Sequence, residues 1–260
     1  MKSVKGFIFC IVFVTVLSLG RTSCHGAEIE MPVVVEAAEE KFLVAIDAGH
    51  QAEGNLEKEP IGPGATIKKT KVTYGTRGNF TGLAEYELTL IVAKKLEQKL
   101  IDRGYEVFMI RDTHDVDISN AQRAQMANEV QADIFIRIHA NSFEDFSVRG
   151  AMTICQTASN PYNSSLYEQS KNLSTFVLEE MVTATGCKKR KIWETDTMTG
   201  INWCQVPVTI VEMGFMSNPK EDKLMATEEY QDKMAEGIAN GVDRYFMDLS
   251  SEDVDIEIAE

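Results

Sequence analysis

Cysteine is scarce and widely spaced in this sequence. The five cysteines are Cys10, Cys24, Cys155, Cys187 and Cys204. Cys10 falls in an apolar leader. The three in the body of the chain are odd in number and far apart, which argues against a disulfide scaffold. A zinc site built from cysteines needs closely spaced pairs, which are also missing. We therefore expect buried thiols, or at most one incidental bridge.

Basic residues are outnumbered. The 260 residues include 26 lysines and arginines against 40 aspartates and glutamates, which gives a formal net charge of −14 at pH 7. This balance argues against nucleic acid or an anionic membrane surface as a partner, and against attraction to anionic wall polymers by charge alone. With 44% hydrophobic and 25% charged residues the composition is that of a globular protein, and we expect one domain with tails.

Long apolar runs are also lacking, except at the start of the chain. Residues 7–19 are almost entirely apolar, two lysines precede them, and small residues follow at 26–27. This order is typical of a secretory signal peptide, which we assign to residues 1–27, although a buried core helix would contain a similar run. The run is too short for a comfortable transmembrane helix, and no other stretch is long and apolar enough to span a bilayer.

Composition shifts mark the limits of the expected domain, which spans 41–247. Residues 28–40 are rich in glutamate, alanine and valine without a clear period, which is typical of a linker. Residues 248–260 carry six acids and no base, which predicts a disordered, solvated tail. We expect secretion after cleavage of the leader. A lipid anchor on Cys24 is an alternative, but the residues before it lack the usual apolar side chain.

Short apolar runs alternate with amphipathic stretches along this domain. Strands are predicted at residues 42–46, 105–110, 132–138, 150–155 and 208–212. Helices are predicted at residues 85–103, 121–130, 166–185 and 227–247, with a further helix start at Asn218-Pro219. Stretches 51–82 and 190–205 show no clean period and are expected to be loops. Strands that alternate with helices predict an α/β sheet covered on both faces.

Three of the predicted buried strands lead into a potential ligand or base: His50, His139 and Glu212. In open α/β sheets, ligands bind beyond the carboxyl ends of the strands. The other two histidines are His25, near the leader, and His114, in a polar turn where we expect it to be exposed. A lone histidine at a buried strand end is more often structural, but two in matching positions favour a site. Zinc accepts imidazole nitrogen and carboxylate oxygen, so we predict a zinc hydrolase.

A third ligand is needed, and Glu85 and Glu87 at the start of the first long helix compete for this role. Two residues along a helix turn the side chain through roughly 200°, so only one of them can face the metal. Glu85 shares a face with Leu88 and Val92, which mark the buried stripe, and Glu87 does not. We therefore favour Glu85. Its alternative role is that of an acid at a helix N-terminus, where the helix dipole stabilises it.

Glu212 is left for a different task. A zinc-bound water loses its proton near pH ~7. A nearby carboxylate can take that proton and pass it to the leaving amine. A glutamate at the end of a buried strand would have its pKa raised towards a useful value. The alternative is a buried glutamate paired to an arginine or to the backbone.

Five segments in order carry a family resemblance. They are Ile46-Asp47-Ala48-Gly49-His50, Glu85-Tyr86-Glu87-Leu88-Thr89-Leu90, Arg123 with Ala127-Asn128, Ile138-His139-Ala140-Asn141, and Val211-Glu212-Met213-Gly214-Phe215-Met216-Ser217-Asn218. Over about residues 42–246 the chain resembles the zinc-dependent N-acetylmuramoyl-L-alanine amidases of the amidase 3 family. The resemblance implies a single α/β domain with a mixed, mostly parallel sheet of about six strands flanked by helices on both faces. It also implies His50, Glu85 and His139 as zinc ligands and Glu212 as the catalytic carboxylate.

The resemblance further implies a reaction and its partners. The reaction is hydrolysis of the amide between the lactyl group of N-acetylmuramic acid and L-alanine of the peptidoglycan stem peptide. Zn²⁺ is the implied cofactor and peptidoglycan the implied partner, and we expect a monomer that is secreted or located in the cell wall. Residues 197–203 resemble the wall of the stem-peptide groove. Two alternatives are a zinc peptidase that cuts within the stem peptide and a non-catalytic wall-binding domain, which would not need Glu212.

Arg137 departs from the family pattern, which often has a small residue before the Ile-His pair. Side chains on a strand alternate between its two faces, so Arg137 shares a face with His139. We expect Arg137 to form a salt bridge or to contact substrate.

Overall fold

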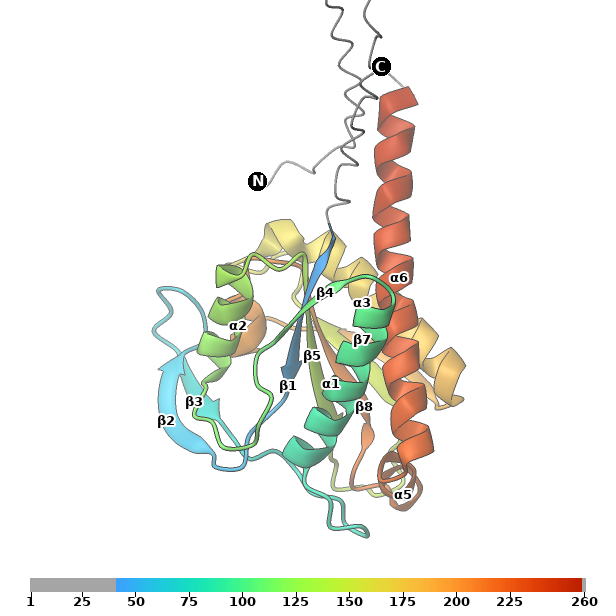
Figure 1. The fold of residues 1–260 in the computed structure, drawn as a ribbon. Helices are drawn as coiled ribbons and strands as arrows, with labels where there is room; N and C mark the ends of the chain where they lie inside the picture. The colour runs from blue at the N-terminus through green and yellow to red at the C-terminus, as the bar shows by residue number, and fades with distance from the viewer. Residues whose placement is uncertain (1–40, 259–260) are drawn as a thin grey trace, which may run out of the picture.

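A six-stranded sheet forms the centre of the protein (Figure 1). The computed structural model describes residues 41–258, and the strands lie in the order β4-β1-β5-β8-β6-β7. Their bounds are β1 (Leu43–Ala48), β4 (Glu106–Met109), β5 (Ile134–Asn141), β6 (Ala151–Cys155), β7 (Lys189–Glu194) and β8 (Val208–Phe215). Neighbouring strands are parallel except β6 and β8, which are antiparallel. The expected mixed, mostly parallel sheet is confirmed.

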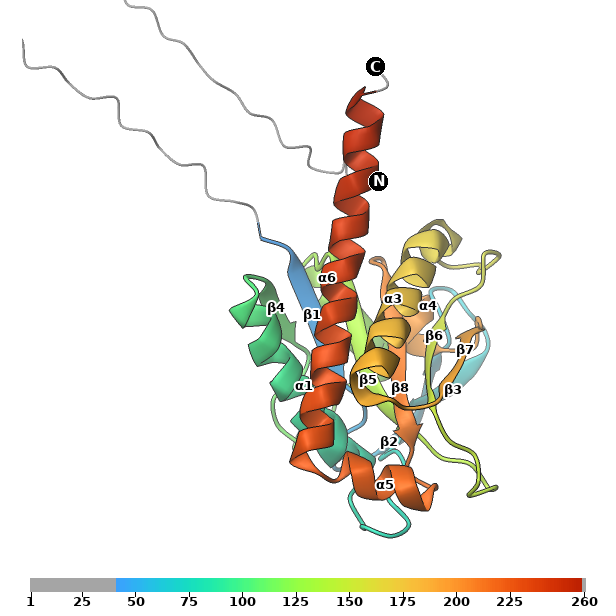
Figure 2. The same ribbon diagram turned by 90° about the vertical axis from the view of Figure 1, so that its right-hand side faces the viewer.

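Helices cover both faces of this sheet (Figures 1 and 2). One face packs against α1 (Glu85–Asp102), α3 (Tyr167–Thr185) and α6 (Glu228–Ile258). The other face packs against α2 (Asn120–Glu129) and the short α4 (Thr199–Asn202). The short η1 (Ser164–Leu166) leads into α3, and α5 (Pro219–Met225) follows β8. The two apolar cores are therefore separated by the sheet, as the alternating sequence pattern requires.

Strand parity decides which side chains meet on each face. On β5, Ile136 and Ile138 point into the core under α1, α3 and α6, whereas Phe135 points into the core under α2 and α4. His139 has the parity of Phe135. On β8, Glu212 has the parity of Ile210, which belongs to the same core as Phe135. His139 and Glu212 therefore lie on the face that α2 and α4 cover only in part.

The helix boundaries follow from local capping. Ser119 accepts a hydrogen bond from the backbone N–H of Gln122 and begins α2. Asn218 accepts bonds from the N–H groups of Lys220 and Glu221 and begins α5. Gly186 ends α3 in the left-handed conformation, with φ of 68°.

Two stretches expected to be loops contain regular structure. Residues 51–82 include the two-stranded ribbon β2 (Asn55–Pro60) and β3 (Lys68–Val72), and residues 190–205 include most of β7 and all of α4. The ribbon is largely exposed, so its strands, NLEKEP and KKTKV, carry no buried apolar alternation for a pattern search to detect. The expectation of loops was wrong for these segments.

The C-terminal helix is longer than the sequence suggested. Helix α6 begins at Glu228 and continues to Ile258, through most of the segment that we expected to be a disordered acidic tail. A helix that is already packed can extend without a new nucleation cost, which the acidic composition does not reveal. Gly237 and Gly241 let α6 approach α3 closely, since a Cβ at these positions would lie 2.4 and 2.5 Å from the Cα atoms of Met181 and Val177.

The remaining expectations concern the ends of the chain and its thiols. The predicted leader (1–27) and linker (28–40) lie outside the described residues. No described helix has the length and apolar character needed to cross a membrane. Cys155, Cys187 and Cys204 are free thiols, and Cys155 and Cys204 are buried, which agrees with the expectation of buried thiols without a disulfide scaffold.

Candidate metal centre

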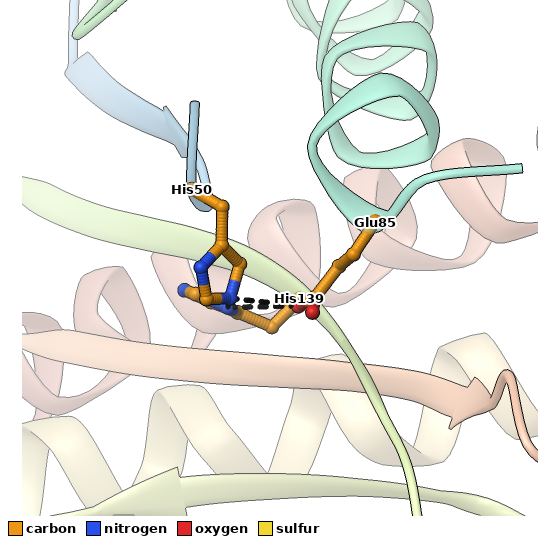
Figure 3. A group of neighbouring side chains, drawn as sticks. All are labelled: His50, Glu85 and His139. Carbon is orange, nitrogen blue, oxygen red and sulfur yellow. Dashed lines mark hydrogen bonds and ion pairs between the residues drawn. The ribbon is translucent and has the colours of Figure 1, made fainter. Parts of the chain in front are cut away.

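Three side chains from distant parts of the chain meet at the carboxyl edge of the sheet (Figure 3). His50 follows β1, Glu85 opens α1, and His139 lies near the end of β5. His50 Nε2 lies 3.1 Å from Glu85 Oε1, His139 Nδ1 lies 3.2 Å from the same oxygen, and the two nitrogens are 3.2 Å apart. The three atoms therefore form a nearly equilateral triangle.

The size of this triangle fits a zinc ion. Zinc bonds to histidine nitrogen and carboxylate oxygen are about 2.0–2.2 Å long, and tetrahedral geometry then separates two ligand atoms by roughly 3.3 Å. The observed edges of 3.1–3.2 Å are close to that value. Two imidazoles and one carboxylate also leave the fourth tetrahedral position open, which is the pattern of catalytic zinc sites.

The orientation of His50 is set by the backbone around it. Its Nδ1 donates a hydrogen bond to the carbonyl of Thr73 at 2.8 Å, which leaves the Nε2 lone pair for a metal. The backbone of His50 has a φ of 63°, a conformation that few residues other than glycine adopt. Gly75 lies against it, since a Cβ there would be 2.8 Å from the His50 ring and 2.5 Å from Glu85 Oε2. The loop after β3 therefore shapes the site directly.

Glu85 is held by backbone donors on both oxygens. Oε1 accepts from the N–H of Ala140 at 3.1 Å and Oε2 from that of Thr76 at 2.7 Å. Burial alone would raise the pKa of Glu85, but its hydrogen bonds with His139 and His50 outweigh burial and hold the pKa well below its usual range. Glu85 is thus an anion at neutral pH. Glu87, the rejected competitor, instead accepts a hydrogen bond from the N–H of Ala84 at 2.9 Å.

His139 is kept neutral by its surroundings. Burial disfavours the imidazolium and lowers the pKa of His139 to about 4, although the neighbouring Glu85 acts in the opposite direction. A neutral imidazole is the form that binds metal ions.

Glu212 lies beside His139 on the neighbouring strand. The two residues are register partners between β5 and β8, and Met152 of β6 is the partner of Glu212 on the other side. Glu212 Oε2 is buried and has no hydrogen-bond partner within the described residues. Burial, with a smaller effect from the charge of Glu85, raises the pKa of Glu212 to about 8. The alternative of a glutamate paired to an arginine is therefore not what the structure contains.

A buried charge network lies beneath the site, and the sequence predicted a salt bridge only for its Arg137 member. Asp47 binds Arg123 Nη1 at 2.6 Å through one oxygen and Arg137 Nε at 2.9 Å through the other. Arg137 thus forms the salt bridge that was one of its two expected roles. The sequence indicated this salt bridge because Asp47 and Arg137 are charged residues inside apolar strands.

Two arginines also hold the backbone that carries His50. Arg123 donates to the carbonyls of Ala48 and His50, at 3.0 and 3.1 Å. Arg111 donates to the carbonyls of Ala48 and Gly49, at 2.8 and 3.1 Å. The unusual backbone conformation of His50 is therefore fixed from below by charged donors. The role of Arg111 could not be predicted from a sequence motif, because its partners are backbone carbonyl groups.

The predicted groove wall, residues 197–203, packs against the β2–β3 ribbon. Lys69 Nζ donates to the carbonyl of Thr197 at 2.7 Å, and Trp203 Nε1 donates to that of Pro60 at 3.0 Å. Helix α4 lies on the same face of the sheet as Glu212, since Ile201 and Ile210 share one core. The ribbon and α4 thus stand together beside the site.

Solved structures share this architecture. The catalytic domain of CwlV, an N-acetylmuramoyl-L-alanine amidase from Bacillus (Paenibacillus) polymyxa var. colistinus, is 27% identical, with a TM-score of 0.64 over 79% of this chain and 98% of that one. The N-acetylmuramyl-L-alanine amidase Ami1 from Mycobacterium smegmatis has the same fold, with a TM-score of 0.70 at 22% identity over 78% of this chain and 96% of that one.

Sequence relatives agree. The uncharacterised protein YqiI of Bacillus subtilis is 30% identical over 85% of this chain and 94% of its own length. The N-acetylmuramoyl-L-alanine amidase AmiC of Neisseria meningitidis is 28% identical over 78% of this chain and 52% of its own, so this chain spans about half of that relative. Residues 44–244, well over half of the chain, match the model of the amidase 3 family, which is described as N-acetylmuramoyl-L-alanine amidase. The chain therefore belongs to the amidase 3 family, the N-acetylmuramoyl-L-alanine amidases.

Proposed function

We propose that this protein is a zinc-dependent peptidoglycan hydrolase. The assigned reaction is hydrolysis of the amide bond between the lactyl group of N-acetylmuramic acid and L-alanine of the stem peptide. Membership of the amidase 3 family supports this reaction. We assign His50, Glu85 and His139 as the metal ligands and Glu212 as the catalytic carboxylate, on the basis of their geometry.

One observation carries the assignment of roles. Three potential ligand atoms form a triangle of zinc-site dimensions, and an unpartnered buried carboxylate lies on the adjacent strand. Buried polar atoms are nearly always satisfied unless they have a functional role or an absent partner. A water or substrate atom between the triangle and Glu212 would satisfy both groups at once.

The chain's own residues can perform the proton transfers. Bound at this triangle, zinc supplies Lewis acidity to the amide carbonyl and to a water molecule. The Glu212 carboxylate accepts the proton of the attacking water and passes it to the nitrogen of the departing L-alanine. Burial raises the pKa of Glu212 to about 8 without metal, so the group is mostly protonated at pH 7, and a divalent cation nearby would lower that pKa and favour the carboxylate form that accepts the proton. Thr73, Thr76 and Ala140 keep His50 and Glu85 in place meanwhile.

Digestion of purified peptidoglycan tests the reaction. The zinc-loaded protein should release intact stem peptides that begin with a free L-alanine amine, and a chelator should abolish the release. Mass analysis of the products distinguishes the alternatives. Fragments of stem peptide with the lactyl amide intact would identify a peptidase. Binding to peptidoglycan without any product would instead identify a wall-binding domain.

Ligand and base variants test the roles separately. Glu212→Gln should retain zinc and lose turnover by at least about a thousandfold, because the proton acceptor is gone. His139→Ala should lose zinc as well. Glu87→Gln is the matched control, since Glu87 lies two residues from Glu85 and points away from the triangle, and it should keep both zinc and activity. Wild-type turnover in Glu212→Gln would overturn the mechanism.

Secretion as a monomer is the remaining part of the proposal. The composition of residues 1–27 supports an export signal. N-terminal sequencing of protein from the culture medium should show that these residues have been removed, and a mature protein that still begins at Met1 would contradict this. Acylated Cys24 at the new N-terminus would identify a lipoprotein instead.

A further inference from the structure

Four consecutive basic residues stand out in a chain with a net charge of −14. Residues 188–191 read Lys-Lys-Arg-Lys, at the start of the edge strand β7. Lys188, Arg190 and Lys191, together with Met152, line an open hollow of about 260 Å³. We call this hollow the basic hollow. The reaction proposed above makes no use of it.

The basic hollow lies on the strands next to the candidate metal centre. In the order of the sheet, β5, β8, β6 and β7 are neighbours, and Figure 2 shows β6 and β7 next to β8. Met152 is the register partner of Glu212, which is in turn the partner of His139. One row of side chains therefore leads from the metal ligands through Glu212 and Met152 to the basic residues.

Strand parity places Lys191 on the same face as this row. Ile192 packs against the core under α1, α3 and α6, so Lys191 and Trp193 on either side of it point to the opposite face. Trp193 is the register partner of Ile154, which belongs to the core on the side of Glu212. Lys191 therefore points towards the substrate side of the sheet.

Lys188 and Lys191 form no ion pair with the described side chains, whereas Arg190 interacts electrostatically with the buried Glu221. Lys189 is paired with Glu179 at 2.8 Å, outside the hollow. Lys188, Arg190 and Lys191 have no carboxylate within 4.0 Å among the described side chains, residues 41–249. Arg190 is oriented by the ring of Phe215, 5.2 Å from its guanidinium carbon, and by a hydrogen bond to the carbonyl of Arg149.

The backbone around Gly150 brings the basic segment to this place. A Cβ at Gly150 would lie 2.4 Å from the carbonyl oxygen of Lys188 and 3.1 Å from Cγ of Arg190, and the φ of 108° also requires glycine. Its N–H donates to Glu221 Oε1 at 2.7 Å, which fixes the start of β6 against α5. The position of the cations is therefore built into the fold and does not depend on mobile side chains alone.

We propose that the basic hollow is a subsite that binds a free carboxylate of the stem peptide, a few residues from the bond that is cleaved. This inference rests on the proposed function. Strands lie about 4.8 Å apart, so β7 is roughly 10 Å from β8 and 14 Å from β5. An extended peptide covers that span in three to four residues at about 3.3 Å each. The hollow, of about 260 Å³, has room for a carboxylate and part of the residue that carries it.

The test compares two peptides that differ only in charge. One is a synthetic stem peptide with its carboxylates free, and the other is the same peptide with those carboxylates amidated. Binding to the full protein is measured by calorimetry, which needs no turnover. The double variant Lys188→Gln/Lys191→Gln should bind the free peptide about five- to tenfold more weakly and the amidated peptide as well as wild type does.

The matched control removes two lysines outside the basic hollow. Lys189 and Lys233 are paired with Glu179 and Glu229 and do not line the hollow. The double variant Lys189→Gln/Lys233→Gln removes two positive charges, as the test variant does. This control should keep both affinities within about twofold. Equal weakening by the two double variants, or equal weakening for both peptides, would overturn the subsite. So would a wild type that does not distinguish the peptides, or a loss confined to binding of poly(glycerol phosphate), which would assign the hollow to an anionic polymer.

Cleavage of the corresponding muramyl peptides separates this inference from the proposed function. If the zinc-loaded wild type releases L-alanine amine equally well with free or amidated carboxylates, the reaction stands and the subsite falls. If no amine is released from either muramyl peptide while the free stem peptide still binds through the two lysines, the subsite stands and the reaction falls.

Discussion

Asp47 is fully buried, and its two oxygens bind two different arginines, Arg123 and Arg137. Burial alone would raise the pKa of Asp47, but the two guanidinium charges outweigh it and hold that pKa well below its usual range. A depressed pKa of this kind contributes stability above the unfolded pKa of 3.8, and the contribution is lost as the pH falls below it. The ion pairs also fix the strand end that carries His50.

Replacement of Asp47 should therefore be costly. Asp47→Asn keeps the size of the side chain but leaves Arg123 and Arg137 buried without a counter-charge, and we expect a loss of about 3–5 kcal/mol in the free energy of unfolding. Urea denaturation measures this. Asp102→Asn, which changes an exposed residue at the end of α1, should cost less than about 0.5 kcal/mol. Similar losses in the two variants would contradict the structural role of the network.

Glu212 should make the stability of the metal-free protein depend on pH. The pKa of Glu212 is about 8 in the folded protein, and its ordinary value of 4.5 applies in the unfolded state. Between pH 4.5 and 8 the folded state therefore binds more protons than the unfolded state. The free energy of unfolding should then fall as the pH rises from about 5 to 8, by up to about 1.4 kcal/mol per pH unit from this group.

Subtraction isolates this contribution. With chelator present, the free energy of unfolding of wild type should fall more steeply from about pH 5 to 8 than that of Glu212→Gln, so the variant should gain stability relative to wild type as the pH rises. Glu168→Gln removes an exposed carboxylate and serves as the matched control. A difference that does not vary with pH would show that Glu212 is not buried as a proton-binding group.

Some of the site could be predicted from single residues and some could not. His50, His139 and Glu212 stand at the ends of apolar runs, and parallel strands bring such ends to one edge of a sheet. Glu85 was chosen over Glu87 from helix geometry, and the structure places Glu85 in the triangle. Arg111 and Thr73 were missed because they act through carbonyl groups, which leave no pattern in the side chains.

At the level of elements, buried structure was predictable and exposed structure was not. Strands β1, β5 and β8 and helices α1 and α3 carry periodic apolar residues, because each packs on a core. The β2–β3 ribbon is held instead by polar contacts such as Trp203 Nε1 to the carbonyl of Pro60. The edge strand β7 alternates exposed and half-buried residues, and its basic residues obscured that period. Long-range polar contacts of this kind cannot be derived from local sequence.

Helix α5 anchors the loop that supplies a donor to Glu85. Asp222 accepts hydrogen bonds from the N–H groups of Phe80 and Thr81, at 2.8 and 3.0 Å. The same loop carries Thr76, whose N–H binds Glu85. The position of α5 is set in turn by its Asn218 cap. The loop and α5 therefore act as one unit that supports Glu85 of the candidate metal centre.

Loss of this anchor should weaken metal binding without abolishing it. Asp222→Ala frees the N–H groups of residues 80 and 81, so Thr76 is held less firmly, and we expect zinc affinity to fall about tenfold or more. Competition with a chromophoric chelator measures the affinity. Asp232→Ala removes an acid that pairs with Lys95 on the far side of the helix layer, and it should leave zinc affinity unchanged. Equal affinities in the two variants would show that the loop does not support Glu85.

For the molecule as a whole, the metal should couple the two sides of the fold. His50 follows β1, Glu85 opens a helix on one face, and His139 points to the other face. A metal that binds all three stabilises only the folded state, by RT ln(1 + [L]/Kd). A hundredfold excess of free zinc over Kd should add about 2.7 kcal/mol to the free energy of unfolding.

Thermal unfolding with chelator and with added zinc measures this coupling. The melting temperature should rise with zinc in wild type and in Glu87→Gln, but not in Glu85→Gln. An equal rise in all three proteins would place the stabilising zinc elsewhere.

Anomalous diffraction at the zinc absorption edge, from crystals of the zinc-loaded protein, tests the central claim most directly. The account predicts a single strong peak between His50 Nε2, Glu85 Oε1 and His139 Nδ1, about 2.0–2.3 Å from each, on the side that faces Glu212. A peak bound by other residues, or none at this position in fully loaded and active protein, would contradict it.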